Sequence, residues 1–153
     1  MPFTLWIDAD GTPKAIKEIL FRVADRRQLS VRLVANRPQS LPRSPRISAI
    51  QVGKDLDAAD AYIVDHCEPG DLVITSDIPL AALVVAKGAT VLETRGQILD
   101  ASNVEARLSV RNLQDEMRGA WVDDGSGPPP FDTKARERFA NALDRWLTTR
   151  RPA

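Results

Sequence analysis

The residues best suited to chemistry are two aspartates that follow the first apolar segment of the chain. Residues 3–7 (Phe-Thr-Leu-Trp-Ile) have the apolar, β-prone character of a strand, and Asp8 and Asp10 come directly after it. In an open α/β sheet, ligands bind at the carboxyl ends of the strands. Two carboxylates placed there predict a functional site. The alternative is that Asp10 or Thr12 caps the following helix and Asp8 is a solvated strand end.

Further aspartates occupy comparable positions later in the chain. Asp77 follows the apolar segment 72–75, and Asp57 and Asp60 lie three residues apart at the start of a predicted helix, where they share one face. If the two strands are neighbours, these carboxylates converge and repel one another unless a cation neutralises them. Oxygen ligands of this kind suit Mg²⁺ or Mn²⁺. The alternative is that Asp57 and Asp77 only cap helices.

Strands and helices alternate along most of the sequence. The pattern predicts strands at 3–7, 31–35, 47–52, 72–75 and 89–92, and helices at 13–27, 57–67, 80–87, 101–117 and 132–150, with a Gly/Pro-rich linker near 123–131. Gly11, Thr12 and Pro13 predict a tight turn, a helix N-cap and a first helical residue. The order predicts one domain spanning residues 1–153, a three-layer α/β/α fold with a central parallel sheet and extra C-terminal helices.

Composition excludes several classes of protein. The 153 residues are 43% hydrophobic and 27% charged, which is typical of a soluble globular domain. No segment has the length and apolar character of a membrane span or a signal peptide, so we expect no membrane partner. The single cysteine, Cys67, rules out an intrachain disulfide and fits a reducing cytoplasm. One cysteine and one histidine do not make a structural zinc site.

The net charge is zero, but the charges are unevenly placed. Residues 31–49 contain four arginines and no acid, whereas residues 51–77 contain seven acids and Lys54 alone. A basic loop beside an acidic cluster suits a phosphate-containing substrate, and chance also produces such patterns. We expect the arginines to neutralise backbone phosphates of RNA. The three arginines expected to make these contacts are Arg37, Arg43 and Arg46. Lys14 is a further candidate for substrate contact, with simple solvation as the alternative. Asn36 is another, with a hydrogen bond to its own loop backbone as the alternative.

Four spaced motifs resemble the YaiI/YqxD family of bacterial proteins of unknown function. They are Trp-Ile-Asp-Ala-Asp at 6–10 with Pro13, Leu-Val-Ala-Asn at 33–36, Gly-Lys-Asp-Leu-Asp-Ala-Ala-Asp at 53–60, and Gly-Asp-Leu-Val-Ile-Thr-Ser-Asp-Ile-Pro-Leu-Ala at 70–81. The match continues through 87–89 and 95–96 and so covers most of the chain. This family is grouped by fold with PIN-like domains, and PIN domains are metal-dependent ribonucleases. The resemblance implies a PIN-like fold, with nuclease activity by analogy. It places acids at Asp8, Asp57 or Asp60, and Asp77.

One position departs from the family pattern. The first motif usually reads Asp-x-Asp-x-Cys-Pro, and here Thr12 replaces the cysteine. The resulting string, residues 8–12, also resembles the first motif of haloacid-dehalogenase-type phosphatases, which implies Asp8 as nucleophile and Asp10 as acid/base. Thr75 or Ser76 would then hold the phosphate, and the acids at 123–124 would bind Mg²⁺. The lysine that such enzymes require is hard to place, and the later motifs fit the YaiI/YqxD family better.

These observations lead to one leading hypothesis and two alternatives. The leading hypothesis is hydrolysis of phosphodiester bonds in RNA, with Asp8 and Asp77 as catalytic residues and Mg²⁺ or Mn²⁺ as cofactor. The alternatives are a phosphomonoesterase and a catalytically silent module that binds metal or a small ligand. The predicted metal ligands are Asp8, Asp10, Asp57, Asp60 and Asp77, and the predicted substrate contacts are Thr12, Lys14, Asn36, Arg37, Arg43, Arg46, Thr75 and Ser76.

Overall fold

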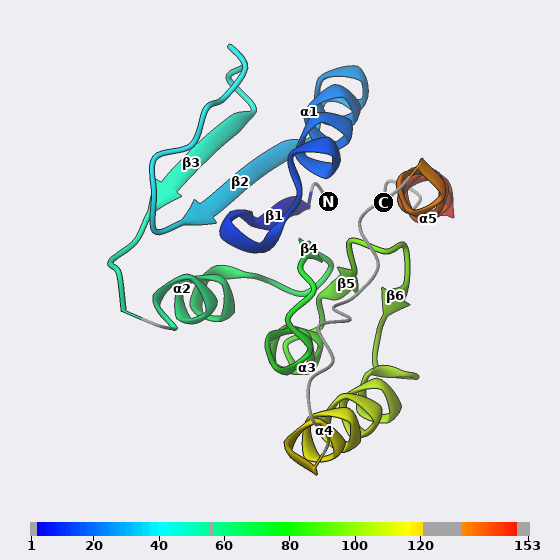
Figure 1. Ribbon diagram of the computed structural model, residues 1–153. Coiled ribbons are helices and arrows are strands. Elements are labelled where there is room, and N and C mark those ends of the chain that lie inside the picture. Colours follow the sequence, from blue (N-terminus) through cyan, green and yellow to red (C-terminus); the bar gives the residue numbers. More distant parts are fainter. Residues whose placement is uncertain (1–2, 56, 121–132, 150–153) are drawn as a thin grey trace.

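The protein forms a six-stranded sheet with helices on both faces (Figure 1). The computed structural model describes residues 3–55, 57–120 and 133–149. The strands are β1 (Thr4–Asp8), β2 (Ser30–Ala35), β3 (Ile47–Gln51), β4 (Leu72–Ile74), β5 (Thr90–Leu92) and β6 (Ile98–Leu99). A 3₁₀ turn, η1 (Ala9–Gly11), precedes the helices α1 (Lys14–Arg27), α2 (Ala58–His66), α3 (Ile78–Ala86), α4 (Val104–Ala120) and α5 (Thr133–Thr149). These elements confirm the predicted three-layer α/β/α class.

The chain begins in the middle of the sheet and builds outward in both directions. The strand order is β3-β2-β1-β4-β5-β6, with every pair parallel except β5 and β6. The first half of the chain adds β2 and β3 on one side of β1, and the second half adds β4, β5 and β6 on the other. The order therefore reverses between β1 and β4, which is where open parallel sheets bind ligands.

Strict alternation along the central strands divides the core into two layers. Leu5 and Ile7 of β1 join the cluster under α1 and α5, whereas Trp6 between them joins the cluster under α2, α3 and α4. On β4, Leu72 and Ile74 face the first cluster and Val73 the second. Because both faces are covered, these strands are apolar at every position, as expected for a parallel sheet.

The start of α1 differs from the prediction. Pro13 is the N-cap and makes no side-chain capping bond, and Lys14 is the first helical residue. The Thr12 hydroxyl instead donates to the Asp8 carbonyl oxygen at 2.7 Å, closing the 3₁₀ turn back onto β1. The predicted Thr12 cap is therefore wrong, because Pro13 is the N-cap and the Thr12 hydroxyl bonds to the turn before it.

The remaining boundaries agree to within a few residues, with one strand missed. Helix α4 begins at Val104 rather than 101, and the sequence predicts no strand where the short antiparallel β6 lies. Two residues carry too little periodicity to be recognised as a strand. The predicted linker near 123–131 lies outside the described residues.

Helix α5 docks on the sheet by the face that the sequence predicts. Phe139, Leu143 and Leu147 are buried, and Trp146 meets Phe3 edge to face at 5.1 Å. The helix approaches the β5–β6 turn closely: Gly96 has a φ of 96°, and a Cβ there would lie 2.8 Å from the carbonyl carbon of Arg138. A side chain at residue 96 would therefore push α5 off the sheet.

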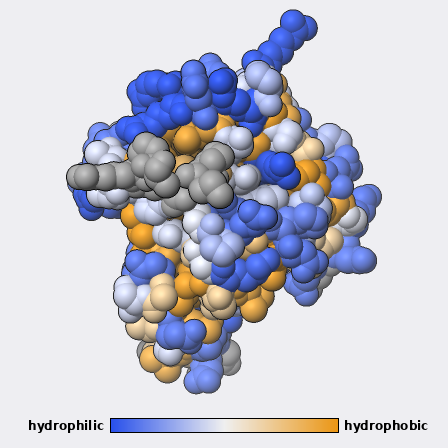
Figure 2. Space-filling model, turned by 180° about the vertical axis from the view of Figure 1, so that it is seen from behind, coloured by the Kyte–Doolittle hydropathy of each residue, from blue (hydrophilic) through white to orange (hydrophobic). Residues whose placement is uncertain are grey.

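Helix α4 covers α3 on one side and leaves apolar side chains on the other. Val104 is buried and Leu108 is partly buried in the core, whereas Val110, Leu113 and Met117 are exposed. Figure 2 shows apolar surface at the lower end of the molecule, where α4 lies. No helix in the part of the chain that the structure describes has the length and apolarity needed to cross a membrane.

A buried carboxylate fixes the amino ends of β1 and β4 against each other. Asp71, only 6% exposed, accepts hydrogen bonds from the Thr4 backbone N–H (2.9 Å), the Trp6 indole Nε1 (3.0 Å) and the Glu68 backbone N–H (2.9 Å). A carboxylate that accepts several N–H donors is well satisfied although it is buried. Asp71 therefore sets how the turn after α2 meets the first strand.

We expect Asp71→Asn to lower the free energy of unfolding by about 2 kcal/mol, because an amide nitrogen facing these donors leaves at least one buried N–H unsatisfied. Urea unfolding followed by tryptophan fluorescence measures the change. Asp65→Asn, at an exposed site on α2, is the matched control and should leave the stability unchanged. Equal stabilities for the two variants would contradict the role given to Asp71.

Candidate functional site

Six aspartates line one pocket at the carboxyl edge of the sheet. The pocket has a volume of about 310 Å³ and lies at the β1–β4 switch point, between the ends of these strands and the segment that enters α2. All five predicted metal ligands line this pocket. The sequence predicts this convergence if the strands that end near Asp8 and Asp77 are neighbours, as β1 and β4 are. The lining carboxylates are Asp8, Asp10, Asp55, Asp57, Asp60 and Asp77, joined by Asn36.

Asp8 is held in place by the neighbouring strand end. The Thr75 hydroxyl donates to Asp8 Oδ2 at 2.9 Å, and the same oxygen of Thr75 accepts the backbone N–H of Asp77 at 3.0 Å. Thr75 is 1% exposed, so it has no open face for a ligand. This chain of two hydrogen bonds fixes the Asp8 carboxylate relative to the first turn of α3. Thr75 therefore positions Asp8 and is not accessible as a substrate contact.

Asp10 reaches across to the second strand instead of capping α1. Its Oδ2 accepts the backbone N–H of Asn36 at 2.8 Å, just beyond the end of β2. This bond ties the turn after β1 to the loop after β2 and turns one Asp10 oxygen away from helix α1. The helix-cap alternative for Asp10 is wrong.

Asp77 caps a helix, as the alternative interpretation predicts, and it also lines the pocket. Asp77 is the N-cap of α3, and its Oδ1 accepts the Leu80 backbone N–H at 3.1 Å. Asp57 occupies the N-cap position of α2 but makes no capping bond with its side chain. A helix N-terminus stabilises a carboxylate through its free N–H groups and its dipole. Capping and lining the pocket are therefore compatible roles for Asp77.

Burial and mutual repulsion raise the pKa of two pocket carboxyls. Burial raises the pKa of Asp8, with further contributions from Asp77 and Asp10, while the Thr75 hydrogen bond opposes the rise. Burial, the charges of Asp77 and Asp8, a side-chain hydrogen bond with Asp77 and the charge of Asp57 together raise the pKa of Asp60 to about 7. Asp60 therefore binds a proton more readily than an isolated aspartate, because ionising it adds a further negative charge to a partly buried group of carboxylates.

The carboxylates are gathered but do not form a closed cage. Over residues 3–55, 57–120 and 133–149, no three His, Cys, Asp or Glu side chains lie close enough together to hold a metal ion as they stand. His66 and Cys67 do not line the pocket. The His66 ring stacks on Tyr62 with centroids 3.9 Å apart, and Cys67 is buried in the core.

The other predicted contacts fall into separate places. Asn36 lines the pocket, and Lys14 is exposed at the start of α1, at the same edge of the sheet. Thr12 is buried against the Asp8 carbonyl oxygen. Ser76 is exposed and its hydroxyl lies 2.6 Å from that of Thr94. Of these four residues, only Asn36 borders the acidic pocket.

The three predicted arginines are split between opposite edges of the sheet. Arg37 follows the end of β2 and lies at the carboxyl edge, whereas Arg43 and Arg46 precede β3. Because β2 and β3 are parallel, the connection between them must return to the amino edge, where the Val31 N–H donates to the Arg46 carbonyl oxygen at 2.8 Å. The structure therefore does not bring Arg43 or Arg46 to the pocket.

One pocket carboxylate was missed by sequence reasoning. Asp55 lines the pocket next to Gly53, in the segment that leaves β3. A signal was present: Asp55 follows a strand end at the same edge as Asp8 and lies two residues before Asp57. Asp55 precedes the predicted helix, so the argument from a shared helix face does not select it.

Comparison with known proteins identifies the family. The family model described as "Uncharacterized BCR, YaiI/YqxD family" matches residues 6–149. This chain belongs to the YaiI/YqxD family. A UPF0178 protein of Shewanella baltica is 49% identical over 145 residues, covering 95% of this chain and 96% of its own. A UPF0178 protein of Cellvibrio japonicus is 49% identical over 147 residues, covering 96% and 97%.

The family match spans every element that builds the pocket. Residues 6–149 include the ends of β1, β2 and β4 and the start of α2, so this YaiI/YqxD protein carries the pocket within the family-wide part of its chain. A UPF0178 protein of Maridesulfovibrio salexigens is likewise 49% identical over 144 residues. The names of these relatives state no activity, so function rests on the site itself.

We expect the free energy of unfolding of the wild type to fall relative to that of Asp60→Asn as the pH rises from about 5 to about 8 in EDTA. Between the ordinary pKa of 3.8 and the folded value of about 7, the folded state keeps a proton that the unfolded state has released. Raising the pH through this window therefore removes stability from the wild type but not from Asp60→Asn.

Urea unfolding at both pH values measures this difference. Asp65→Asn on the exposed side of α2 is the control and should follow the wild type. A stability difference between wild type and Asp60→Asn that is the same at both pH values would contradict the raised pKa of Asp60.

Proposed function

We propose that this YaiI/YqxD protein is a divalent-metal-dependent nuclease of PIN-like type that hydrolyses phosphodiester bonds in RNA. The observation that carries the proposal is the set of six aspartates around one pocket at the switch point of the sheet. So many carboxylates in one pocket are costly without a cation to neutralise them. Hydrogen bonds to the Asn36 N–H and to the first turn of α3 account for Asp10 and Asp77 singly, but not for the gathering of six carboxylates around one pocket.

The donor chemistry of the pocket fits Mg²⁺ or Mn²⁺. The charged lining groups are all carboxylates, and Asn36 adds an amide. Mg²⁺ is commonly bound by one or two carboxylates, with water and substrate phosphate completing its coordination, so a closed cage of three carboxylates is not required. The repulsion that raises the pKa of Asp60 marks the place where added positive charge is most favourable. Asp8, Asp60 and Asp77 would form the centre of the site, with Asp10 and Asp57 beside them.

The chain's own groups divide the work of such a site. A divalent cation held there would supply an activated water and charge stabilisation for the leaving oxygen. Asp8 is held in one orientation by Thr75, and Asp77 by the first turn of α3. Fixed carboxylates lose little entropy when they bind a ligand, which favours a productive geometry. Asn36 and the exposed Lys14 and Arg37 lie at the same edge, where they suit substrate phosphates.

The phosphatase alternative is less well supported. It assigns the phosphate to Thr75 or Ser76, but Thr75 is buried with its hydroxyl on Asp8. Its second acidic pair, residues 123–124, lies outside the described residues. An enzyme of that class would cleave phosphomonoesters and leave a trapped aspartyl-phosphate on Asp8, which a nuclease would not.

We expect calorimetry to show Mn²⁺ binding by the wild type, and Asp8→Asn and Asp77→Asn each to weaken it at least tenfold. Asparagine is isosteric and remains a good N-cap at residue 77, so α3 should stay folded. Cleavage of a labelled single-stranded RNA in Mn²⁺ should fall by about 10²-fold or more in both variants. Asp65→Asn, at an exposed site on α2 outside the acidic pocket, serves as the charge-matched control.

The outcomes separate the competing functions. Metal binding without turnover of RNA or phosphomonoesters would identify a silent binding module. Turnover of phosphomonoesters alone would identify the phosphatase. Wild-type cleavage rates in Asp8→Asn would remove the proposed mechanism altogether.

We expect Thr75→Val to weaken Mn²⁺ binding by about 10- to 100-fold, because an outer residue that orients a metal ligand commonly contributes this much. Valine keeps the shape but removes the donor to Asp8 and the acceptor for the Asp77 N–H. The loss should be greater at low pH, since that hydrogen bond holds down the pKa of Asp8. Thr75→Ser, which restores the hydroxyl, should recover most of the affinity; no recovery would mean that packing, not the hydrogen bond, is at stake.

A further inference from the structure

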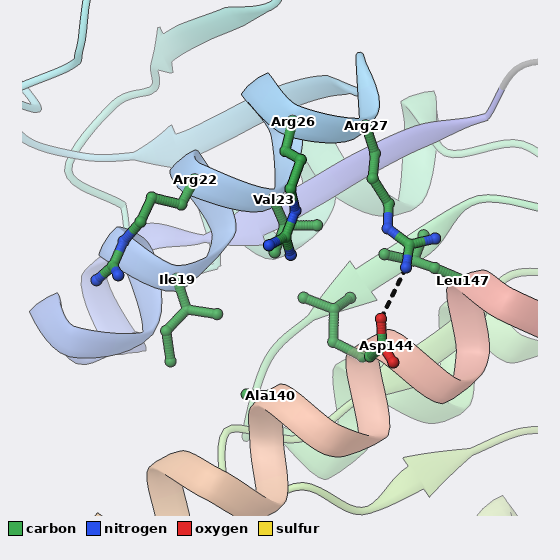
Figure 3. A pocket seen from close by; sticks show the side chains of 9 residues that line it. Ile19, Arg22, Val23, Arg26, Arg27, Ala140, Asp144 and Leu147 are labelled. Carbon is green, nitrogen blue, oxygen red and sulfur yellow. Dashed lines mark hydrogen bonds and ion pairs between the residues drawn. The ribbon is translucent and has the colours of Figure 1, made fainter.

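The last two turns of α1 carry arginines that line two grooves outside the acidic pocket. Arg22 and Arg26, four residues apart, border a groove of about 220 Å³ against α5 and a second groove of about 350 Å³ against the segment before β3. Figure 3 shows Arg22, Arg26 and Arg27 extending from α1 beside the first groove, with Arg27 directed at Asp144 on α5. We call the second groove the α1 groove; the residues that matter in it are Phe21, Arg22, Asp25, Arg26 and Arg43.

The guanidinium groups of the α1 groove are not neutralised by neighbours. Arg27 outside it is paired with Asp144 at 2.7 Å, but among the described residues no ion pair is formed by Arg22, Arg26 or Arg43. Asp25 is the one carboxylate that lines the groove. Three exposed guanidinium groups against one carboxylate leave the groove positively charged, which suits an anionic ligand.

The α1 groove is separate from the aspartates. Helix α1 starts at the carboxyl edge, after β1, and returns along the sheet, so its last turns lie at the amino edge together with Arg43, just before β3 (Figure 1). The acidic pocket lies at the opposite edge. If these arginines lay close to the pocket, they would pair with its aspartates. Because they lie at the opposite edge, they remain available for a ligand.

We propose that the α1 groove binds the backbone of a single-stranded RNA, as a site distinct from the acidic pocket. Guanidinium groups match phosphate oxygens in paired, forked hydrogen bonds, and Arg22, Arg26 and Arg43 offer three of them around one cavity. Phe21 lines the same groove and is only partly buried, so part of its side chain is available to a base. A basic groove with an aromatic wall is the combination that binds single strands without sequence preference.

This chemistry favours nucleic acid over an acidic peptide, because a peptide carboxylate would gain nothing from the aromatic wall. The identification of the ligand as RNA rests on the proposed nuclease function. The groove would then anchor a strand whose other part reaches the pocket, so that binding energy gained at one edge places the phosphodiester at the other.

The test measures binding without cleavage. Fluorescence anisotropy of a labelled single-stranded RNA of about a dozen nucleotides is recorded in EDTA over a range of KCl concentrations. We expect the wild-type affinity to fall with salt, and Arg22→Gln/Arg26→Gln to reduce the slope of log affinity against log salt by about 1.4, because each phosphate contact contributes about 0.7 for a single strand. At about 0.1 M salt the double variant should bind roughly tenfold more weakly.

Two further variants sharpen the test. Asp25→Asn removes the opposing charge in the groove and should tighten binding by about two- to threefold. Arg136→Gln/Arg145→Gln removes two exposed arginines of α5 that line neither groove, so it changes the net charge equally and should leave the slope unchanged. An unaltered slope in the α1 double variant, or an equal loss in the α5 double variant, would overturn the proposal. Equally effective competition by polyglutamate would overturn RNA as the partner.

Failure here is distinguishable from failure of the nuclease proposal. If no RNA is cleaved under any condition but the α1 double variant still lowers the salt slope, the groove stands and the nuclease falls. If RNA is cleaved and the α1 double variant has wild-type affinity and wild-type kcat/KM, the groove falls and the nuclease stands.

Discussion

The structure depends on the parallel pairing of β1 and β4, which side chains secure at both ends. At the amino end, Asp71 accepts hydrogen bonds from Thr4 and Trp6; at the carboxyl end, Thr75 donates to Asp8. Three residues pair in register between these ends, from Leu5 with Leu72 to Ile7 with Ile74. With so short a ladder, a slip of one residue would turn every side chain of β4 to the other layer. The two ties hold the register that places Asp8 beside Asp77.

That register also explains why burial and charge can coexist at the site. Asp8 is the last residue of β1 and Asp77 comes three residues after β4, so their carboxylates emerge where the packed core ends. The Thr75 hydroxyl and the first turn of α3 stabilise the charged forms, while burial and neighbouring carboxylates oppose them. At Asp60, burial and the charges of Asp77 and Asp8 raise the pKa to about 7. The pocket is a site under electrostatic strain, which is the state that a bound cation relieves.

The same topology places three arginines at the edge of the sheet opposite the aspartates. Helix α1 and the connection from β2 to β3 both run from the carboxyl edge to the amino edge, so they carry Arg22, Arg26 and Arg43 away from the aspartates. A chain with no net charge therefore has one acidic edge and one basic groove. In the proposed function, the basic groove would attract a polyanion and the acidic edge would hold a cation, so the two tasks would fall to different parts of the fold.

The sequence by itself determined the α/β class, the order of nearly all elements and five of the six aspartates of the pocket. These follow from local properties: period of hydrophobicity, turn residues, and the rule that parallel strands end at one edge. It did not determine where the arginines go, because residues 37 and 43 are close in sequence yet lie at opposite edges once β2 and β3 pair in parallel. Nor did it show that Thr12 and Thr75 bond to Asp8, or that Asp10 bonds to the Asn36 backbone. The Thr12 bond is local and depends on the 3₁₀ turn after β1. The Thr75 and Asn36 contacts join segments that only the strand order brings together, and the tertiary structure decides that order.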